Sequence, residues 1–161
     1  REWSLGQLAD EDRAFIRSFV PTVELPLEGG RHLLCFHGTP ASYDEVILPQ
    51  TPEGEVRGYL GAHLPAIMTG GHTHLQQIRR LDDAFFFNPG SVGFAFDHAQ
   101  ERGPGLRADP WAEYAILTSE GELVSLEFRQ VPLDLPALRA IIGASGHADT
   151  AGQLARYQPR G

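Results

Sequence analysis

Two short apolar runs in this chain are each followed by glycine and histidine. The stretch "HLLCFHG" follows a Gly-Gly break and ends at His37-Gly38. The stretch "LPAIMTGGHTH" repeats the same order of apolar residues, glycine and histidine, and ends at His72 and His74. Runs of this length bounded by glycine are typical of buried strands. The pattern therefore predicts two strands with histidines at their C-terminal ends.

Further strands are predicted downstream. Residues 84–87, "AFFF", form an aromatic strand between an acidic turn and the turn-forming Asn88-Pro89-Gly90. Alternating apolar and polar residues at 112–118 and 122–131 flank Glu120-Gly121. This pattern predicts a β-hairpin.

Helical spacing is clearest near the N-terminus. Asp10 is the expected N-cap of a helix that places Ala14, Phe15 and Phe19 on one face, and Pro21 ends it.

The middle and the end of the chain carry weaker helical patterns. Periodicity is slight over residues 42–48 and firmer over 53–62, and a modest helix is expected from Leu135 to Ile142. The remaining C-terminal residues have little to bury. We therefore expect one domain portion over residues 1–134, followed by a short helix and a flexible tail over 135–161.

Composition and charge narrow the class of protein. The 161 residues are 42% hydrophobic and 21% charged, which suits one globular domain. No apolar run approaches the roughly 18 to 20 residues of a membrane helix, so we expect no membrane partner and a cytoplasmic location. A net charge of −8 argues against nonspecific nucleic-acid binding. The sequence contains no lysine, which excludes a lysine nucleophile or a phosphate-loop lysine.

The candidate chemistry lies in His37, His72 and His74. Ligands in α/β architectures collect at the C-terminal ends of strands, and neutral imidazole suits Zn, Fe, Mn or Co. Two histidines one residue apart point to the same side only in an extended chain. If the chain curls, the pair could serve two ions roughly 3.5 to 4 Å apart, as in a binuclear hydrolytic site. Taken alone, the His-x-His pair is more often a pair of surface or hydrogen-bonded histidines than a metal site.

Three ordered strings make the pattern more specific. "HGTP" at 37–40, "GGHTH" at 70–74 and "NPGSV" at 88–92 resemble the C-terminal half of the calcineurin-like metallophosphoesterases, especially the small single-domain prokaryotic branch. The resemblance covers roughly residues 31–128. It implies an α/β (α+β) fold that is part of a four-layer α/β/β/α sandwich of mixed sheets, with the N-terminal half absent.

The same resemblance implies roles for particular residues. His37 and His72 would bind one divalent ion and His74 a second, with Mn, Fe, Zn, Co and Ni not distinguished. Gly38, Gly71 and Asn88 would shape the site, with Gly71 allowing close approach and Asn88 beginning a turn beside it. The implied reaction is hydrolysis of a phosphomonoester or phosphodiester by a hydroxide that bridges the two metals.

Part of the family pattern is missing. Family members carry an Asp-x-His, then a Gly-Asp that supplies a bridging carboxylate, then an Asn-His pair, and residues 1–36 contain none of these. We therefore expect a segment that is inactive without those carboxylates, and whose partner is the missing N-terminal half or a second copy of the chain. The alternative is a non-catalytic scaffold or interaction module of the same fold, like the retromer subunit.

Overall fold

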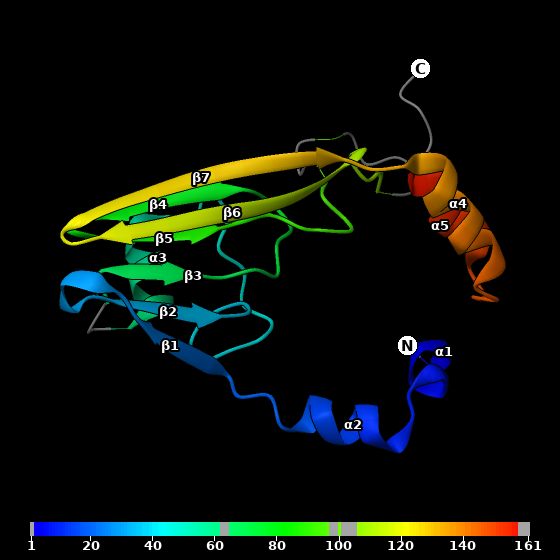
Figure 1. Ribbon diagram of the computed structural model, residues 1–161, viewed down its shortest axis with the longest axis horizontal. Coiled ribbons are helices and arrows are strands. Elements are labelled where there is room, and N and C mark those ends of the chain that lie inside the picture. Colours follow the sequence, from blue (N-terminus) through cyan, green and yellow to red (C-terminus); the bar gives the residue numbers. More distant parts are fainter. Residues whose placement is uncertain (1, 62–64, 97–99, 101–105, 158–161) are drawn as a thin grey trace.

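The computed structural model describes residues 2–61, 65–96, 100 and 106–157, and its centre is a mixed five-stranded sheet (Figure 1). The sheet order is β1-β2-β3-β5-β4. β2–β3 and β3–β5 are parallel pairs, whereas the edge strands β1 and β4 pair antiparallel to their neighbours. The strands are β1 (Thr22–Pro26), β2 (His32–Phe36), β3 (Ile67–Thr69), β4 (Gln77–Leu81) and β5 (Ala84–Asn88).

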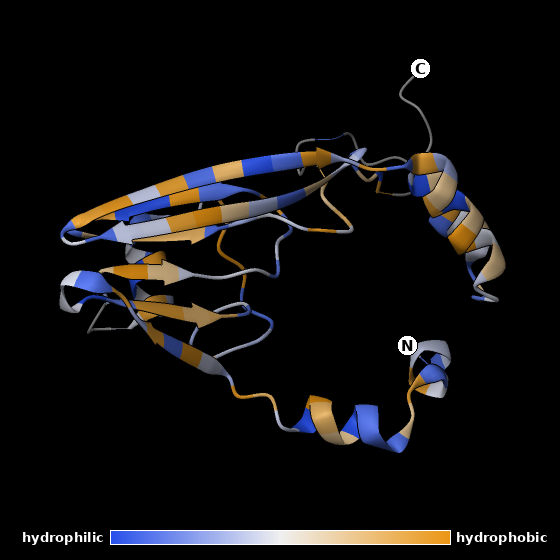
Figure 2. Ribbon diagram, in the orientation of Figure 1, coloured by the Kyte–Doolittle hydropathy of each residue, from blue (hydrophilic) through white to orange (hydrophobic). Residues whose placement is uncertain are grey.

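The three parallel strands are the apolar runs of the sequence, so the strands predicted around residues 32–36, 67–69 and 84–87 are confirmed. β2 and β3 are hydrophobic along most of their length (Figure 2). Because parallel strands end at the same edge of a sheet, the residues that follow β2, β3 and β5 meet there.

The predicted hairpin is confirmed and forms a second sheet of two strands, β6 (Trp111–Glu120) and β7 (Leu123–Pro132). Its alternating pattern is visible along β7 (Figure 2). Gln76 Nε2 donates to the carbonyl oxygens of Tyr114 and Arg129 at 3.3 and 3.2 Å. This side chain ties the hairpin to the loop that leads into β4.

One face of the five-stranded sheet is covered by α3 (Glu53–Leu60), which confirms the helix predicted over residues 53–62. Residues 42–48, where helical spacing was slight, form no helix. The main core lies between α3, the segment before it and the sheet, and consists of Ile47, Val56, Leu60, Met68, Leu81, Ala84 and Phe86.

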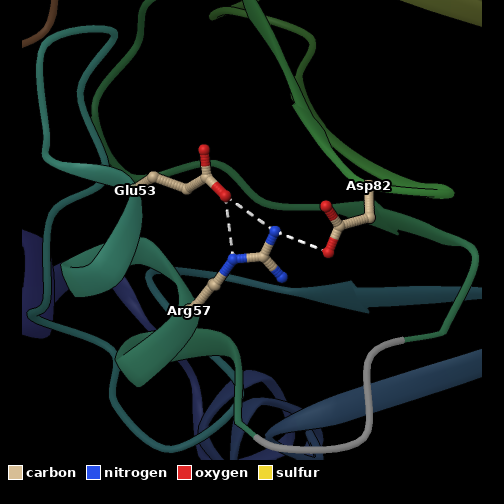
Figure 3. Close-up of polar contacts among 3 residues, drawn as sticks. All are labelled: Glu53, Arg57 and Asp82. Carbon is tan, nitrogen blue, oxygen red and sulfur yellow. Dashed lines mark hydrogen bonds and ion pairs between the residues drawn. The ribbon is translucent and has the colours of Figure 1, made fainter.

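A polar contact also joins α3 to the turn between β4 and β5 (Figure 3). Arg57 donates from Nη2 to Glu53 at 2.7 Å and to Asp82 at 2.9 Å. All three side chains are in contact with solvent, so this network orients the helix more than it stabilises the fold.

The N-terminal helices α1 (Glu2–Gln7) and α2 (Asp10–Arg17) lie apart from the sheets (Figure 1). The expected N-cap at Asp10 is corrected: Ala9 is the N-cap, and the Asp12 carboxylate accepts the Ala9 N–H at 2.9 Å. Acidic residues in the first helical turn favour this arrangement through the helix dipole. The apolar residues Phe15 and Phe19 are exposed, with 66% and 62% of their surfaces accessible to solvent.

The C-terminal residues are more ordered than the sequence suggested. The predicted helix after residue 135 is present as α4 (Leu135–Ala144), and residues expected in a flexible tail form α5 (Thr150–Arg156). The Asp149 side chain caps α5 by accepting from Gly152 N–H. The two helices pack in a second apolar core of Ala108, Ile142 and Tyr157, with Phe94, Leu133, Leu135, Leu138 and Leu154 around it.

Two smaller features complete the fold. A short 3₁₀ turn, η1 (Glu28–Gly30), connects β1 to β2 and contacts the hairpin. Among the described residues, no helix is long and apolar enough to cross a membrane.

Candidate metal centre

Two histidines from different strand ends are in direct contact. His37 follows β2 and His72 follows β3, and His37 Nε2 lies 3.0 Å from His72 Nδ1. The two loops are joined through the backbone, because Gly71 N–H donates to the His37 carbonyl at 2.7 Å. The parallel pairing of β2 with β3 thus brings together two rings that are 35 residues apart in the chain.

The backbone curls at both histidines of the His-x-His pair. His72 has φ 61° and His74 has φ 55°, in the left-handed region that is uncommon for residues other than glycine. Such conformations carry a free-energy cost and are found most often at functional sites. The pair is therefore not extended, and its two rings take different partners.

The ring of His74 is held by the loop that follows β5. Its Nδ1 lies 2.9 Å from the Phe94 carbonyl oxygen, and the rings of Phe94 and Phe96 meet it edge to face. A carbonyl oxygen can only accept a hydrogen bond, so Nδ1 carries the ring proton. The lone pair of neutral His74 is consequently on Nε2, the nitrogen available to a cation.

The surroundings of His37 favour its neutral form. Partial burial lowers the pKa of His37, and repulsion from His72 and then His74 lowers it further, whereas the nearby Asp44 opposes these effects. A lowered imidazole pKa favours the unprotonated ring. The unprotonated ring is the form that binds divalent metals.

Asn88 forms hydrogen bonds with the loop that carries His72 and His74. Its side chain is fully buried, and Nδ2 donates to the Gly71 carbonyl at 2.6 Å and to Thr73 Oγ1 at 3.0 Å. Its Oδ1 accepts from Gly90 N–H at 2.9 Å. Asn88 therefore joins the end of β5 to the backbone of Gly71, directly before His72, and to the side chain of Thr73, between the two histidines.

Backbone carbonyls at Gly38 and aromatic rings at Gly70 leave no room for a side chain at either position. A Cβ at Gly38 would lie 2.6 Å from the Glu45 carbonyl oxygen, and one at Gly70 would lie 2.8 Å from the Phe36 ring. At Gly71, the nearest atoms to an added Cβ, on His37, are at an ordinary 3.9 Å. Gly70 was not singled out from the sequence, although its position directly before a strand-end histidine motif was the available signal.

The donor set fits part of a metal site. Two imidazole nitrogens that bind one ion at about 2.0–2.1 Å lie roughly 2.9–3.3 Å apart in octahedral or tetrahedral geometry. The 3.0 Å separation of His37 Nε2 and His72 Nδ1 falls in that range, and it is also the length of a hydrogen bond between the two rings. Over the described residues, no three His, Cys, Asp or Glu side chains are gathered so that they could hold a metal ion. The chain thus presents an imidazole pair and a third oriented histidine.

The architecture is that of an α/β sandwich, and comparisons with solved structures specify it. A metallophosphoesterase from Sphaerobacter thermophilus aligns with 96% of this chain and 64% of its own, with a TM-score of 0.66 and 19% identity. A hypothetical protein from Pyrococcus horikoshii aligns with 92% of this chain and 55% of its own, with a TM-score of 0.65 and 18% identity. The chain therefore shares the fold of these two structures, one of them a metallophosphoesterase, over most of its own length.

The other comparisons are weaker. Vps29 from Entamoeba histolytica, in a structure with bound Zn²⁺, aligns with 71% of this chain and 62% of its own at 18% identity and a TM-score of 0.46. The sequence matches no family model and no curated protein. The chain spans 55% and 64% of the lengths of the two more similar structures.

Proposed function

We propose that this chain supplies the histidine ligands of a metal-dependent phosphoesterase site. His37 and His72 would hold one divalent ion, and His74 would hold a second through Nε2. The observation that carries the proposal is the 3.0 Å approach of His37 Nε2 to His72 Nδ1 from two adjacent strand ends. Divalent ions bound there would polarise a phosphate ester and activate water near neutral pH.

The chain's own residues would have distinct tasks. The lowered pKa of His37 keeps that ring unprotonated, the Phe94 carbonyl selects the tautomer of His74, and Asn88 holds the intervening loop. The carboxylates that two adjacent ions require would come from an N-terminal half or from a second copy of the chain. The substrate would be a phosphomonoester or a phosphodiester.

The test is metal binding by histidine variants. Titration with Co²⁺, followed by visible absorption, is expected to show binding by the unmodified chain. His37→Asn and His72→Asn are each expected to weaken that binding by more than about tenfold, because losing even a residue that merely orients a ligand costs roughly 10–100-fold.

A matched control is available in β2, the strand that leads to His37. His32 lies at the opposite end of β2 and pairs with exposed Glu24 at 3.2 Å. His32→Asn removes one imidazole and is expected to leave Co²⁺ binding unchanged. Equal loss of binding in all three variants, or no binding by the unmodified chain, would rule out the proposed centre.

A non-catalytic binding module of the same fold is the competing proposal. The exposed apolar residues Phe15, Phe19 and Val20 favour it, since they offer a surface for another protein chain. The two proposals differ in turnover. With carboxylates supplied by a further segment or a second copy, the phosphoesterase is expected to hydrolyse bis(4-nitrophenyl) phosphate with Mn²⁺, and the binding module is not.

A further inference from the structure

The C-terminal helices pack against the loop that orients His74. Tyr157, the C-cap of α5, is 8% exposed and belongs to the second apolar core together with Ala108 and Ile142. Phe94, whose carbonyl oxygen accepts the hydrogen bond from His74 Nδ1, packs against the same core. One apolar cluster therefore connects the end of the chain to the candidate metal centre.

Specific contacts hold the loop from the side of α5. The Tyr157 hydroxyl donates to the Gly93 carbonyl, and the Arg156 guanidinium carbon lies 5.0 Å from the centroid of the Phe94 ring. The Arg156 carbonyl accepts from Ala108 N–H at 2.9 Å. The residue before Phe94 and the ring of Phe94 itself are thus both held by the last two described residues.

The rest of the loop leaves the Phe94 carbonyl free for His74. Phe94 N–H donates to Ser91 Oγ at 3.0 Å, and the Ala95 carbonyl accepts from Asp109 N–H at 2.7 Å. Together with the Tyr157 hydroxyl on the Gly93 carbonyl, these bonds hold the peptide group that precedes Phe94 and the one that follows Ala95. The peptide group between them carries the carbonyl that accepts from His74. The direction of its carbonyl then determines which nitrogen of His74 carries the proton.

We propose that Arg156 and Tyr157 are positioning residues for His74. By holding the loop at Gly93 and Phe94, they keep the His74 proton on Nδ1 and direct the Nε2 lone pair toward a divalent cation. This inference rests on the proposed function, because it gives His74 a cation to bind. The residues themselves contact neither the cation nor a substrate.

The expected size of the effect follows from the contacts. A neutral imidazole can carry its proton on either nitrogen, and one hydrogen bond to a carbonyl contributes about 1 kcal/mol to the choice. Groups that orient a metal-binding histidine typically change metal affinity by about 10–100-fold when they are removed.

The experiment compares the full chain with Tyr157→Phe and with the double variant Arg156→Ala, Tyr157→Phe. Tyr157→Phe keeps the aromatic ring in the apolar core and removes only the hydroxyl, so the fold is retained. Long-range ¹H–¹⁵N NMR of the metal-free protein at mildly alkaline pH reports the tautomer of His74. Zn²⁺ titration by calorimetry reports affinity for the cation.

The unmodified chain is expected to show His74 with its proton on Nδ1. The double variant is expected to show a mixture of tautomers and a roughly tenfold or greater loss of affinity for the more weakly bound Zn²⁺ ion. Tyr59→Phe is the matched control, because it removes an exposed tyrosine hydroxyl that bonds only to Glu55 within α3. It is expected to change neither measurement.

Two results separate this inference from the proposed function. A folded double variant whose His74 tautomer is unchanged would overturn the positioning role, whatever the metal affinity. If the tautomer changes as expected but no form of the protein binds Zn²⁺, the positioning of His74 stands and the metal centre does not.

Discussion

At the scale of single residues, glycine decides how closely the loops around His37 can approach one another. Gly38 is surrounded by backbone carbonyls, and a Cβ there would lie 2.6 Å from the Glu45 oxygen and 2.9 Å from those of Ser42 and Tyr43. Backbone atoms cannot move aside as the end of a flexible side chain can. The loop after β2 therefore depends on the absence of a side chain at this position.

Gly38→Ala is expected to lower the free energy of unfolding by about 1–3 kcal/mol, the usual cost of overpacking. Gly58→Ala is the matched control, since an added Cβ in the middle of α3 meets nothing within 4 Å. That substitution is expected to stabilise the protein by about 0.5–1 kcal/mol through helix propensity. Urea unfolding of both variants checks the prediction, and equal effects of the same sign would contradict it.

At the scale of elements, Arg31 joins the five-stranded sheet to the tip of the β6–β7 hairpin. Its guanidinium donates to the carbonyl oxygens of Glu122 at 2.6 Å and Gly121 at 2.8 Å, and Gly121 N–H donates to the Glu28 carboxylate at 2.7 Å. A two-stranded sheet by itself is at best marginally stable in water. The hairpin therefore depends on such attachments as well as on its own pairing.

Arg31→Ala is expected to loosen the hairpin tip. Loss of two hydrogen bonds from a charged group that is partly in solvent should cost about 1–2 kcal/mol of local stability, or a roughly 5- to 30-fold faster amide exchange near the turn. Hydrogen exchange read by mass spectrometry checks this expectation. Arg80→Ala, at an exposed position of β4, serves as control, and equal acceleration in both variants would count against the attachment.

At the scale of the whole molecule, apolar surface is concentrated at the N-terminal side. Phe15, Phe19 and Val20 are 66%, 62% and 60% exposed, and Val23 and Leu25 on the edge strand β1 are each 46% exposed. Exposed apolar groups next to an open strand edge favour association with another chain. We therefore expect the chain in isolation to pair with a second copy.

Sedimentation of the purified chain is expected to show a concentration-dependent dimer. The double substitution Phe15→Ser, Phe19→Ser is expected to weaken it at least tenfold, or by about 1.4 kcal/mol. Leu123→Ser, at the 76% exposed tip of the hairpin, is the control for general loss of apolar surface. A strictly monomeric unmodified chain would contradict this expectation.

The sequence predicted strands best where apolar residues either follow one another without interruption or alternate regularly with polar ones. The apolar runs before His37 and Gly70, the aromatic strand and the alternating hairpin were all identified, because burial on one or both faces of a strand leaves a direct mark on composition. β4 was missed because "QIRRL" is buried only at its ends, at Gln77 and Leu81. β1 was missed because only its first residue is even partly buried.

The packing of the C-terminal helices could not be predicted from the sequence. The residues that anchor α5, chiefly Leu154 and Tyr157, are single apolar positions in a polar stretch. Their partners Ala108 and Phe94 are distant in the chain. No local pattern reveals such pairs, so a flexible end was the natural expectation.

The sequence by itself determined which chemical groups stand at the strand ends, in what order, and with which glycines beside them, because these are local consequences of residue type and spacing. Only the tertiary structure decided that His37 meets His72 while His74 turns to Phe94, and that the last helix supports this loop. Contacts of that kind depend on the parallel pairing of strands and on left-handed backbone at two histidines, and neither is encoded within any short window of the chain.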